Sequence, residues 1–178
     1  MLKLFSLFMC GAVLLAQPAQ PAPSRAPGFC LADSTGQWRD LADYRGKIVL
    51  IEFMQTTCPH CISFSDVLAG IQKKYAGKVQ PISIAIAPDA PQALMKFTAD
   101  HKLTWPLVLD MGQVAMSYVR TGAINFPTLY LVDGAGMIAG HWEYGALTKE
   151  IFEGTQLSRE IDKLLGLSTP APPAAKKK

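Results

Sequence analysis

The sequence is poor in charge and has no basic stretch of the kind that a nucleic-acid-binding face requires. Lys and Arg together number 17, Asp and Glu number 14, and charged residues make up only 17% of the chain. Five basic residues, Lys3, Arg25 and Lys176–Lys178, lie in the terminal segments, which leaves 12 basic against 14 acidic residues elsewhere. Because nucleic-acid binding needs clustered basic side chains, we expect no nucleic-acid partner.

Long apolar runs are missing too, except for one near the N-terminus. Leu4–Ala16 form an apolar run of 13 residues directly after Lys3, shorter than the roughly 20 residues that a membrane-spanning helix needs. A positive residue, a short apolar run and small residues after it are typical of an export signal. We predict a signal peptide over 1–22, cleaved between Ala16 and Ala22, and a periplasmic or otherwise extracytoplasmic location. An uncleaved inner-membrane anchor is the alternative.

Cysteine is scarce, with four in 178 residues. Cys10 lies inside the apolar run after Met9, which is too large for a lipoprotein signal, so we expect this cysteine to be removed with the signal. The other three, Cys30, Cys58 and Cys61, are an odd number, so one thiol has no partner within the chain. We expect Cys58 and Cys61 to be the pair, because extracytoplasmic surroundings let a disulfide persist, and Cys30 to be a small buried hydrophobic residue.

Two segments have compositions that do not favour folding. Residues 23–27 are predicted to be a linker and residues 167–178 a disordered tail, because Pro, Ala and Lys bury too little apolar surface to offset the ordering entropy. The span 28–166 between them suits one domain with a hydrophobic core, which we expect to be a monomer.

Apolar patterns within this span alternate between strand and helix periodicity. An N-terminal hairpin is predicted over 28–39 around the turn 33–36. Further strands are predicted at 47–54, 82–87, 107–109, 128–132 and 137–142, and helices at 58–75, 91–102, 114–120 and 155–165. This order predicts an α/β fold, and the closing hairpin makes its sheet mixed.

Cys58-Pro59-His60-Cys61 lies where a helix is predicted to begin. Cysteines three residues apart on one helical turn have Cα atoms about 5–6 Å apart, as a disulfide needs. The partial positive charge and free N–H groups of a helix N-terminus favour the thiolate of the first cysteine, and the thiolate is the attacking species in disulfide exchange. We predict that Cys58 is the nucleophile and that Cys61 resolves the mixed disulfide.

The two residues between the cysteines have predicted roles as well. Pro59 suits the first helical turn and holds the geometry of the pair. His60 places a second positive charge near the sulfur, which would stabilise the reduced form and make the pair more oxidising. Zinc would need two further ligands at suitable spacing, and haem attachment would need histidine at position 62, which is Ile62. We therefore expect no metal and no cofactor.

Glu52 interrupts an apolar strand six residues before Cys58. A buried acid costs several kcal/mol unless it stays neutral or finds partners. A carboxyl of raised pKa beneath the disulfide would accept the proton of Cys61 during exchange. The alternative is a Glu at the strand edge that reaches solvent.

These motifs together resemble the thioredoxin superfamily, and most closely the TlpA/ResA-type exported thiol–disulfide oxidoreductases. The matching stretches are Ala26-Pro27-Gly28-Phe29, Gly46 to Phe53, Cys58 to Cys61, Trp105 to Asp110, Phe126-Pro127-Thr128 and Val132-Asp133-Gly134. The resemblance implies a three-layer thioredoxin-like fold, with a central mixed sheet flanked by helices and an N-terminal β-hairpin.

The resemblance also implies roles for a proline loop. It implies a cis bond at Pro127, a loop packed against the cysteine pair, and substrate binding by Phe126, Pro127 and Thr128. It implies that Glu52 matches the buried acid of the superfamily. The expected partners are exported thiol or disulfide proteins and a membrane redox donor or acceptor.

Departures from the family leave the direction of the reaction open. Thr57 replaces the usual Trp, Phe126 is bulkier than the usual residue, and Pro59-His60 resembles the dipeptide of the oxidising protein DsbA. We favour a reductase, with a DsbA-like oxidase or isomerase as the alternative. Two other classes are weaker alternatives: a peroxiredoxin, which would need Thr in place of Gln55, and a copper-delivery protein, which has a longer cysteine spacing.

Overall fold

The computed structural model describes residues 24–119 and 124–167. The predicted signal peptide, Cys10 and nearly all of the predicted tail lie outside these ranges. Within them, every helix is too short or too polar to cross a bilayer.

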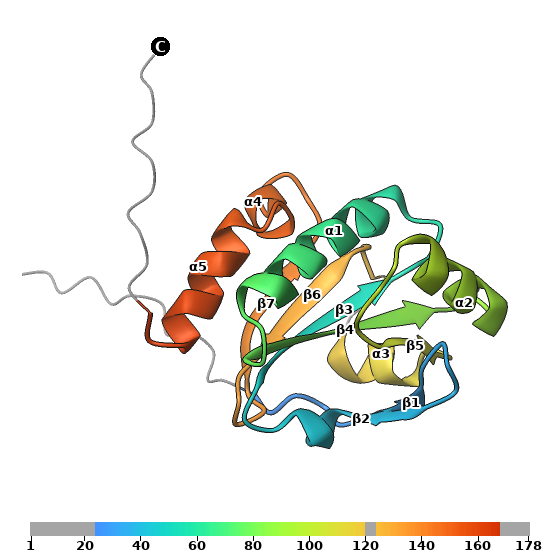
Figure 1. Ribbon diagram of the computed structural model, residues 1–178, viewed down its shortest axis with the longest axis horizontal. Helices are drawn as coiled ribbons and strands as arrows, with labels where there is room; N and C mark the ends of the chain where they lie inside the picture. Colours follow the sequence, from blue (N-terminus) through green and yellow to red (C-terminus); the bar gives the residue numbers. More distant parts are fainter. Residues whose placement is uncertain (1–23, 120–123, 168–178) are drawn as a thin grey trace, which may run out of the picture.

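A five-stranded sheet forms the centre of the domain (Figure 1). Its strand order is β5-β4-β3-β6-β7. The central strand β3 runs parallel to β4 and antiparallel to β6, while β5 is parallel to β4 and β7 is antiparallel to β6. The bounds are β3 Ile48–Met54, β4 Val79–Ile86, β5 Leu107–Asp110, β6 Thr128–Val132 and β7 Ile138–Glu143. The predicted mixed sheet is confirmed.

Helices cover both faces of this sheet (Figure 1). The bounds are α1 Pro59–Lys74, α2 Pro91–Asp100, α3 Gln113–Tyr118, α4 Lys149–Phe152 and α5 Thr155–Leu164. Helices α1, α4 and α5 lie on one face, while α3 and the hairpin of β1 (Cys30–Ala32) and β2 (Trp38–Asp40) lie on the other. The sequence patterns did not predict α4 or the 3-10 helix η1, Leu41–Tyr44, because each spans a single turn.

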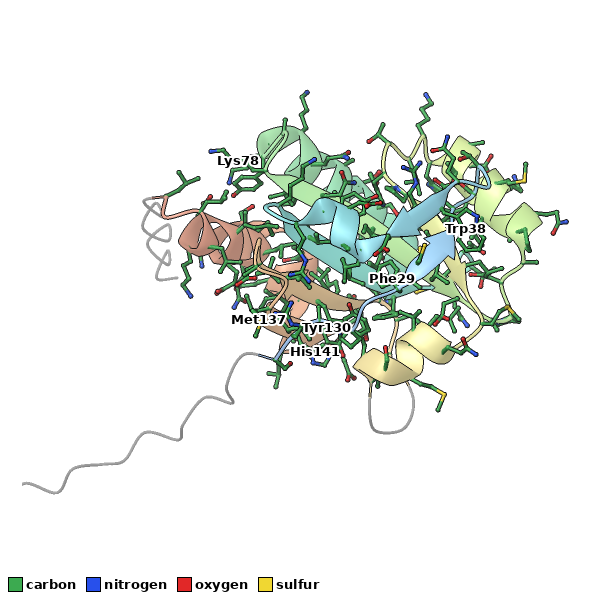
Figure 2. All side chains as sticks on the ribbon, turned by 90° about the horizontal axis from the view of Figure 1, so that it is seen from below. Phe29, Trp38, Lys78, Tyr130, Met137 and His141 are labelled. Carbon is green, nitrogen blue, oxygen red and sulfur yellow. The ribbon has the colours of Figure 1, made fainter. Side chains whose placement is uncertain are left out.

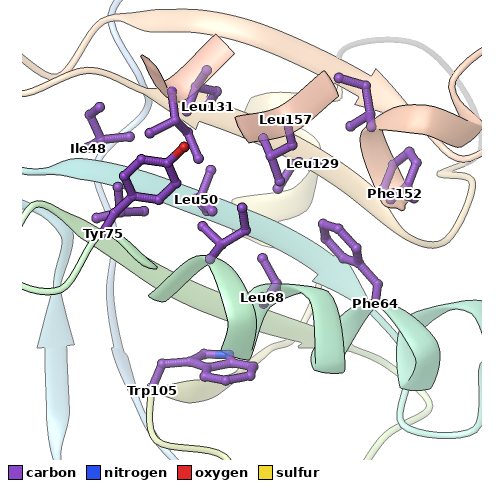
Figure 3. Close-up of a cluster of buried hydrophobic side chains, with 14 residues drawn as sticks. Ile48, Leu50, Phe64, Leu68, Tyr75, Trp105, Leu129, Leu131, Phe152 and Leu157 are labelled. Carbon is purple, nitrogen blue, oxygen red and sulfur yellow. The ribbon is translucent and has the colours of Figure 1, made fainter. Parts of the chain in front are cut away.

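Strand β3 supplies both halves of the core because successive side chains point to opposite faces. Ile48 and Leu50 pack with α1 and the C-terminal helices, whereas Val49 and Ile51 pack towards the hairpin and α3. Figure 3 shows the first cluster, in which residues from α1, β6 and the last helices surround Leu50. By the same alternation Glu52 lies on the face that α1 covers.

The hairpin corrects one prediction, and the residues before it are tied to the sheet. In the predicted linker 23–27, Ile138 N–H donates to the Ser24 carbonyl and Ala26 N–H donates to the Gly136 carbonyl. These bonds hold this segment against the turn that leads into β7. Cys30 is exposed and not buried, because Leu31 takes the inward position of this short strand.

Seen from below, the hairpin crosses the sheet (Figure 2). Phe29 lies beneath it in the second core cluster, and Trp38 lies at its outer end. Below Phe29 in this view Tyr130 and His141 stack, with ring centroids 4.2 Å apart. The hairpin thus covers a part of the sheet that α3 leaves open.

Candidate active site

Cys58 is the N-cap residue of α1. Its backbone is extended, Pro59 occupies the first helical turn, and the Cys58 N–H donates to the Gln55 carbonyl at 3.1 Å. The Cys61 N–H points at the Cys58 sulfur, with N and Sγ 3.4 Å apart. A backbone donor of the free helix end is therefore directed at this sulfur, as stabilisation of a thiolate requires.

The two thiols differ in access. Both cysteines are free in the structure, but Cys58 is half-buried whereas Cys61 is wholly buried. Cys61 lies in an apolar cluster with residues such as Met54 and Leu94. Burial raises the pKa of the Cys61 thiol far above its usual range, and the nearby Glu52 carboxyl raises it further. An external disulfide can reach only Cys58, and Cys61 needs a proton acceptor before it reacts.

Glu52 is wholly buried, so the alternative of a solvent-reaching side chain is wrong. Its Oε2 accepts a hydrogen bond from Ser83 Oγ at 2.7 Å. Its Oε1 has no hydrogen-bond partner among the residues that the structure describes. Burial raises the pKa of Glu52 to about 8, and the Ser83 hydrogen bond opposes that rise. The carboxyl can therefore take up or release a proton near neutral pH.

The loop before β6 lies against the first sulfur. The bond between Phe126 and Pro127 is cis, and the Cys58 sulfur lies 3.8 Å from the Phe126 carbonyl oxygen. The Pro127 carbonyl accepts from the Tyr144 N–H at 3.0 Å. Thr128 is wholly buried and its hydroxyl donates to the Asn125 carbonyl at 2.5 Å. The Thr128 side chain therefore holds the loop, and the predicted part of Thr128 in substrate binding stays a prediction.

His60 is exposed and stacks on Tyr144, with ring centroids 4.1 Å apart and an interplanar angle of 21°. Tyr144 directly follows β7, more than 80 residues later in the chain. This contact could not be predicted from the sequence, because no local pattern links two positions so far apart in the chain.

A second support holds the loop that leads into Cys58. Asp89 accepts from the Thr56 N–H at 2.7 Å and from the Thr56 hydroxyl at 2.6 Å. The Gln55 side chain also approaches the Ala87 carbonyl, at 3.5 Å. The residues before the cysteine are therefore fixed to the segment between β4 and α2, which the sequence could not reveal.

Metal ligands do not gather within residues 24–119 and 124–167, the part of the chain that the structure describes. No group of three or more His, Cys, Asp or Glu side chains there could hold a metal ion.

Comparison with known proteins places this chain in the class of thioredoxin-like protein-disulfide oxidoreductases. The chain belongs to the AhpC/TSA family, whose sequence pattern matches residues 23–141. The thiol-disulfide oxidoreductase ResA of Bacillus cereus (strain ATCC 10987 / NRS 248) is 30% identical over 129 residues, covering 72% of each chain. The thioredoxin-like protein YneN of Bacillus subtilis (strain 168) is 27% identical over 145 residues, covering 80% of this chain and 78% of that one.

A solved structure supports the same class. The protein from Chlorobium tepidum that is assigned as the thiol:disulfide interchange protein DsbE is 26% identical and superposes with a TM-score of 0.65. The match covers 80% of this chain and 99% of that chain. The expected TlpA/ResA-like resemblance and thioredoxin-like fold are therefore confirmed, and the protein is a protein-disulfide oxidoreductase.

Proposed function

We propose that Cys58 and Cys61 are the redox pair and that they exchange disulfides with exported proteins. One observation carries this proposal: a reachable sulfur accepts the N–H of a helix end, while its partner three residues later is wholly buried. This asymmetry supports attack by Cys58 and resolution by Cys61.

In the reducing direction the reaction has two steps. The Cys58 thiolate attacks a substrate disulfide, which forms a Cys58–substrate bond and releases one substrate thiolate. Cys61 then gives its proton to Glu52 and attacks the Cys58 sulfur. The Cys58–Cys61 bond forms and the second substrate thiolate leaves, so two electrons pass from the pair to the substrate. Each leaving thiolate is protonated from solvent, and oxidation is the reverse of this sequence.

Glu52 is the proposed proton acceptor in the second step. A thiol as buried as Cys61 ionises only if a base lies close to it in the same dry environment. With a pKa of about 8, the carboxyl can hold the proton near neutral pH and return it when the pair is reduced again. This range suits a group that acts as both base and acid.

The proline loop is the proposed substrate contact. The Phe126 carbonyl lies 3.8 Å from the Cys58 sulfur, so an extended substrate segment that pairs with Phe126 and Pro127 would bring its disulfide to Cys58. Pro59 and His60 are exposed beside the sulfur, where they would tune the potential of the pair.

The proposed direction is reduction of exported client proteins by a monomer outside the cytoplasm. The likeness to ResA proteins supports it. A membrane redox donor would then keep the pair reduced. The Pro59-His60 dipeptide supports the alternative, a DsbA-like oxidase or isomerase.

Equilibration with glutathione tests the proposal. The full chain is incubated at defined ratios of reduced to oxidised glutathione, and the disulfide fraction is measured by mass after alkylation. A potential towards about −270 mV, as in thioredoxin, supports a reductase, and one towards about −120 mV, as in DsbA, supports an oxidant. Cys30→Ser is the matched control and should leave the potential unchanged. Absence of any reversible two-electron exchange would refute the redox pair.

A further inference from the structure

Three buried polar side chains form a hydrogen-bonded chain beneath Cys61. Trp105 Nε1 donates to Ser83 Oγ at 3.0 Å, and Ser83 Oγ donates to Glu52 Oε2 at 2.7 Å. The exposed fractions of the three residues are 5%, 1% and 0%. Surface water therefore does not compete for these two hydrogen bonds. Their geometry is set by how the surrounding strands pack.

The backbone holds this chain in place. Ser83 lies directly opposite Glu52 in the parallel pair of β3 and β4. Ser83 N–H also donates to the Pro106 carbonyl at 3.0 Å, which brings the residue after Trp105 beside β4. The positions of all three side chains thus follow from the register of neighbouring strands.

The direction of the hydrogen bonds follows from donor chemistry. An indole N–H only donates, and a serine hydroxyl has one hydrogen. Since Ser83 Oγ accepts from Trp105, its single hydrogen is free to point at Glu52 Oε2. Oε2 must then be an acceptor, and a proton on it would meet the serine hydrogen. A proton on the neutral carboxyl therefore lies on Oε1, the oxygen without a partner among the described side chains.

We propose that Trp105 and Ser83 are positioning residues that keep Oε2 of Glu52 as an acceptor and make Oε1 the single oxygen that takes and returns the proton of Cys61. The inference rests on the proposed function for its role in exchange. The S–H bond of Cys61 breaks and an O–H bond forms on Oε1. This step moves a proton only, and neither group is oxidised or reduced.

Few other groups act on this carboxyl. The titratable group that faces it from α1 is Cys61, whose pKa the Glu52 charge raises. Its strand neighbours are Ser83 on β4 and Leu129 on β6, and neither carries a charge. Loss of the Ser83 hydroxyl should therefore act directly on the protonation of Glu52, without compensation from a second ion.

The indole N–H resonance of Trp105 provides the test. The ¹H–¹⁵N signals of the three tryptophans are followed from pH 6 to 10 in the reduced full chain, in Glu52→Gln and in Ser83→Ala. The Trp105 signal should titrate with the Glu52 midpoint of about 8, and this step should vanish in Glu52→Gln. In Ser83→Ala the carboxyl midpoint, read from its ¹³C signal, should rise by roughly 1–2 pH units.

Two further variants separate positioning from packing. Trp105→Phe keeps the Ser83 hydroxyl but frees it to rotate, so the midpoint should rise by less than in Ser83→Ala. Tyr75→Phe is the matched control, because it removes a hydroxyl that donates to the Asp162 carboxylate at 2.8 Å at the other end of α1. It should leave the Glu52 midpoint unchanged even if it lowers stability.

A Trp105 signal that stays flat in the wild-type protein while the Glu52 carboxyl titrates would overturn the inference. So would an unchanged midpoint in Ser83→Ala. These NMR readouts do not depend on disulfide exchange. If the proposed function fails, the protein will not equilibrate with glutathione, while the Trp105 indole signal will still titrate with Glu52.

Discussion

Glu52→Gln should make the stability of the protein much less dependent on pH. In the folded protein burial raises the pKa of this carboxyl to about 8, from an ordinary value of 4.5. The folded state therefore binds the proton more tightly than the unfolded chain does. Stability from this group is fully present below pH 4.5 and is lost as the pH rises towards 8.

The size of the effect follows from the difference between the two pKa values. One pH unit corresponds to about 1.4 kcal/mol, so ionisation of Glu52 in the unfolded chain costs on the order of 3 kcal/mol of folding free energy between pH 4 and pH 7. The glutamine variant has no such proton, so its stability relative to the wild-type protein should rise by that amount over this range.

Denaturant unfolding of the reduced proteins at pH 4, 5.5, 7 and 8.5 measures this difference. Both chains share every other titrating group, so subtracting one curve from the other isolates Glu52. A difference that is the same at all four pH values would refute the raised pKa and with it the role of Glu52 as a proton acceptor near neutral pH.

Four other substitutions test the site. Cys61→Ser should accumulate a mixed disulfide with substrate that is visible by mass, and Cys58→Ser should form none; trapping on Cys61 instead would reverse their proposed roles. Asp89→Ala should free the loop at Thr56 and lower the free energy of unfolding by about 1–3 kcal/mol. An unchanged denaturant midpoint would show that the hydrogen bonds between Thr56 and Asp89 do not stabilise the fold. His60→Ala should lower the reduction potential of the pair in the glutathione equilibrium, because it removes the side chain predicted to favour the reduced form, and a raised potential would contradict that role.

Much of the fold could be predicted from the sequence because its strands and helices are encoded locally. The apolar run of β3 and the helical spacing of α1 each arise within one segment, and the cysteine motif lies between them. The cysteine pair and the buried acid could be found for the same reason. The one-turn elements α4 and η1 were missed because one turn shows no periodicity.

The remaining features depend on how distant segments meet. Ser83 reaches Glu52 only through the register of β3 and β4, and Trp105 reaches Ser83 only because its segment lies beside β4. The exposure of Cys30 depends on which of two alternate positions in a three-residue strand faces the core. Strand register, and which side chains of a three-residue strand point towards the core, cannot be predicted from a single sequence.

Tyr144 connects two parts of the site that act on different properties of the enzyme. Its ring stacks on His60, and its backbone N–H holds the Pro127 carbonyl. A shift of this one residue would move both the side chain proposed to tune the redox potential and the loop proposed to bind clients. Substitutions in this loop that adapt the protein to a new client would therefore also change the reduction potential of the cysteine pair. Client choice and reduction potential would then evolve together.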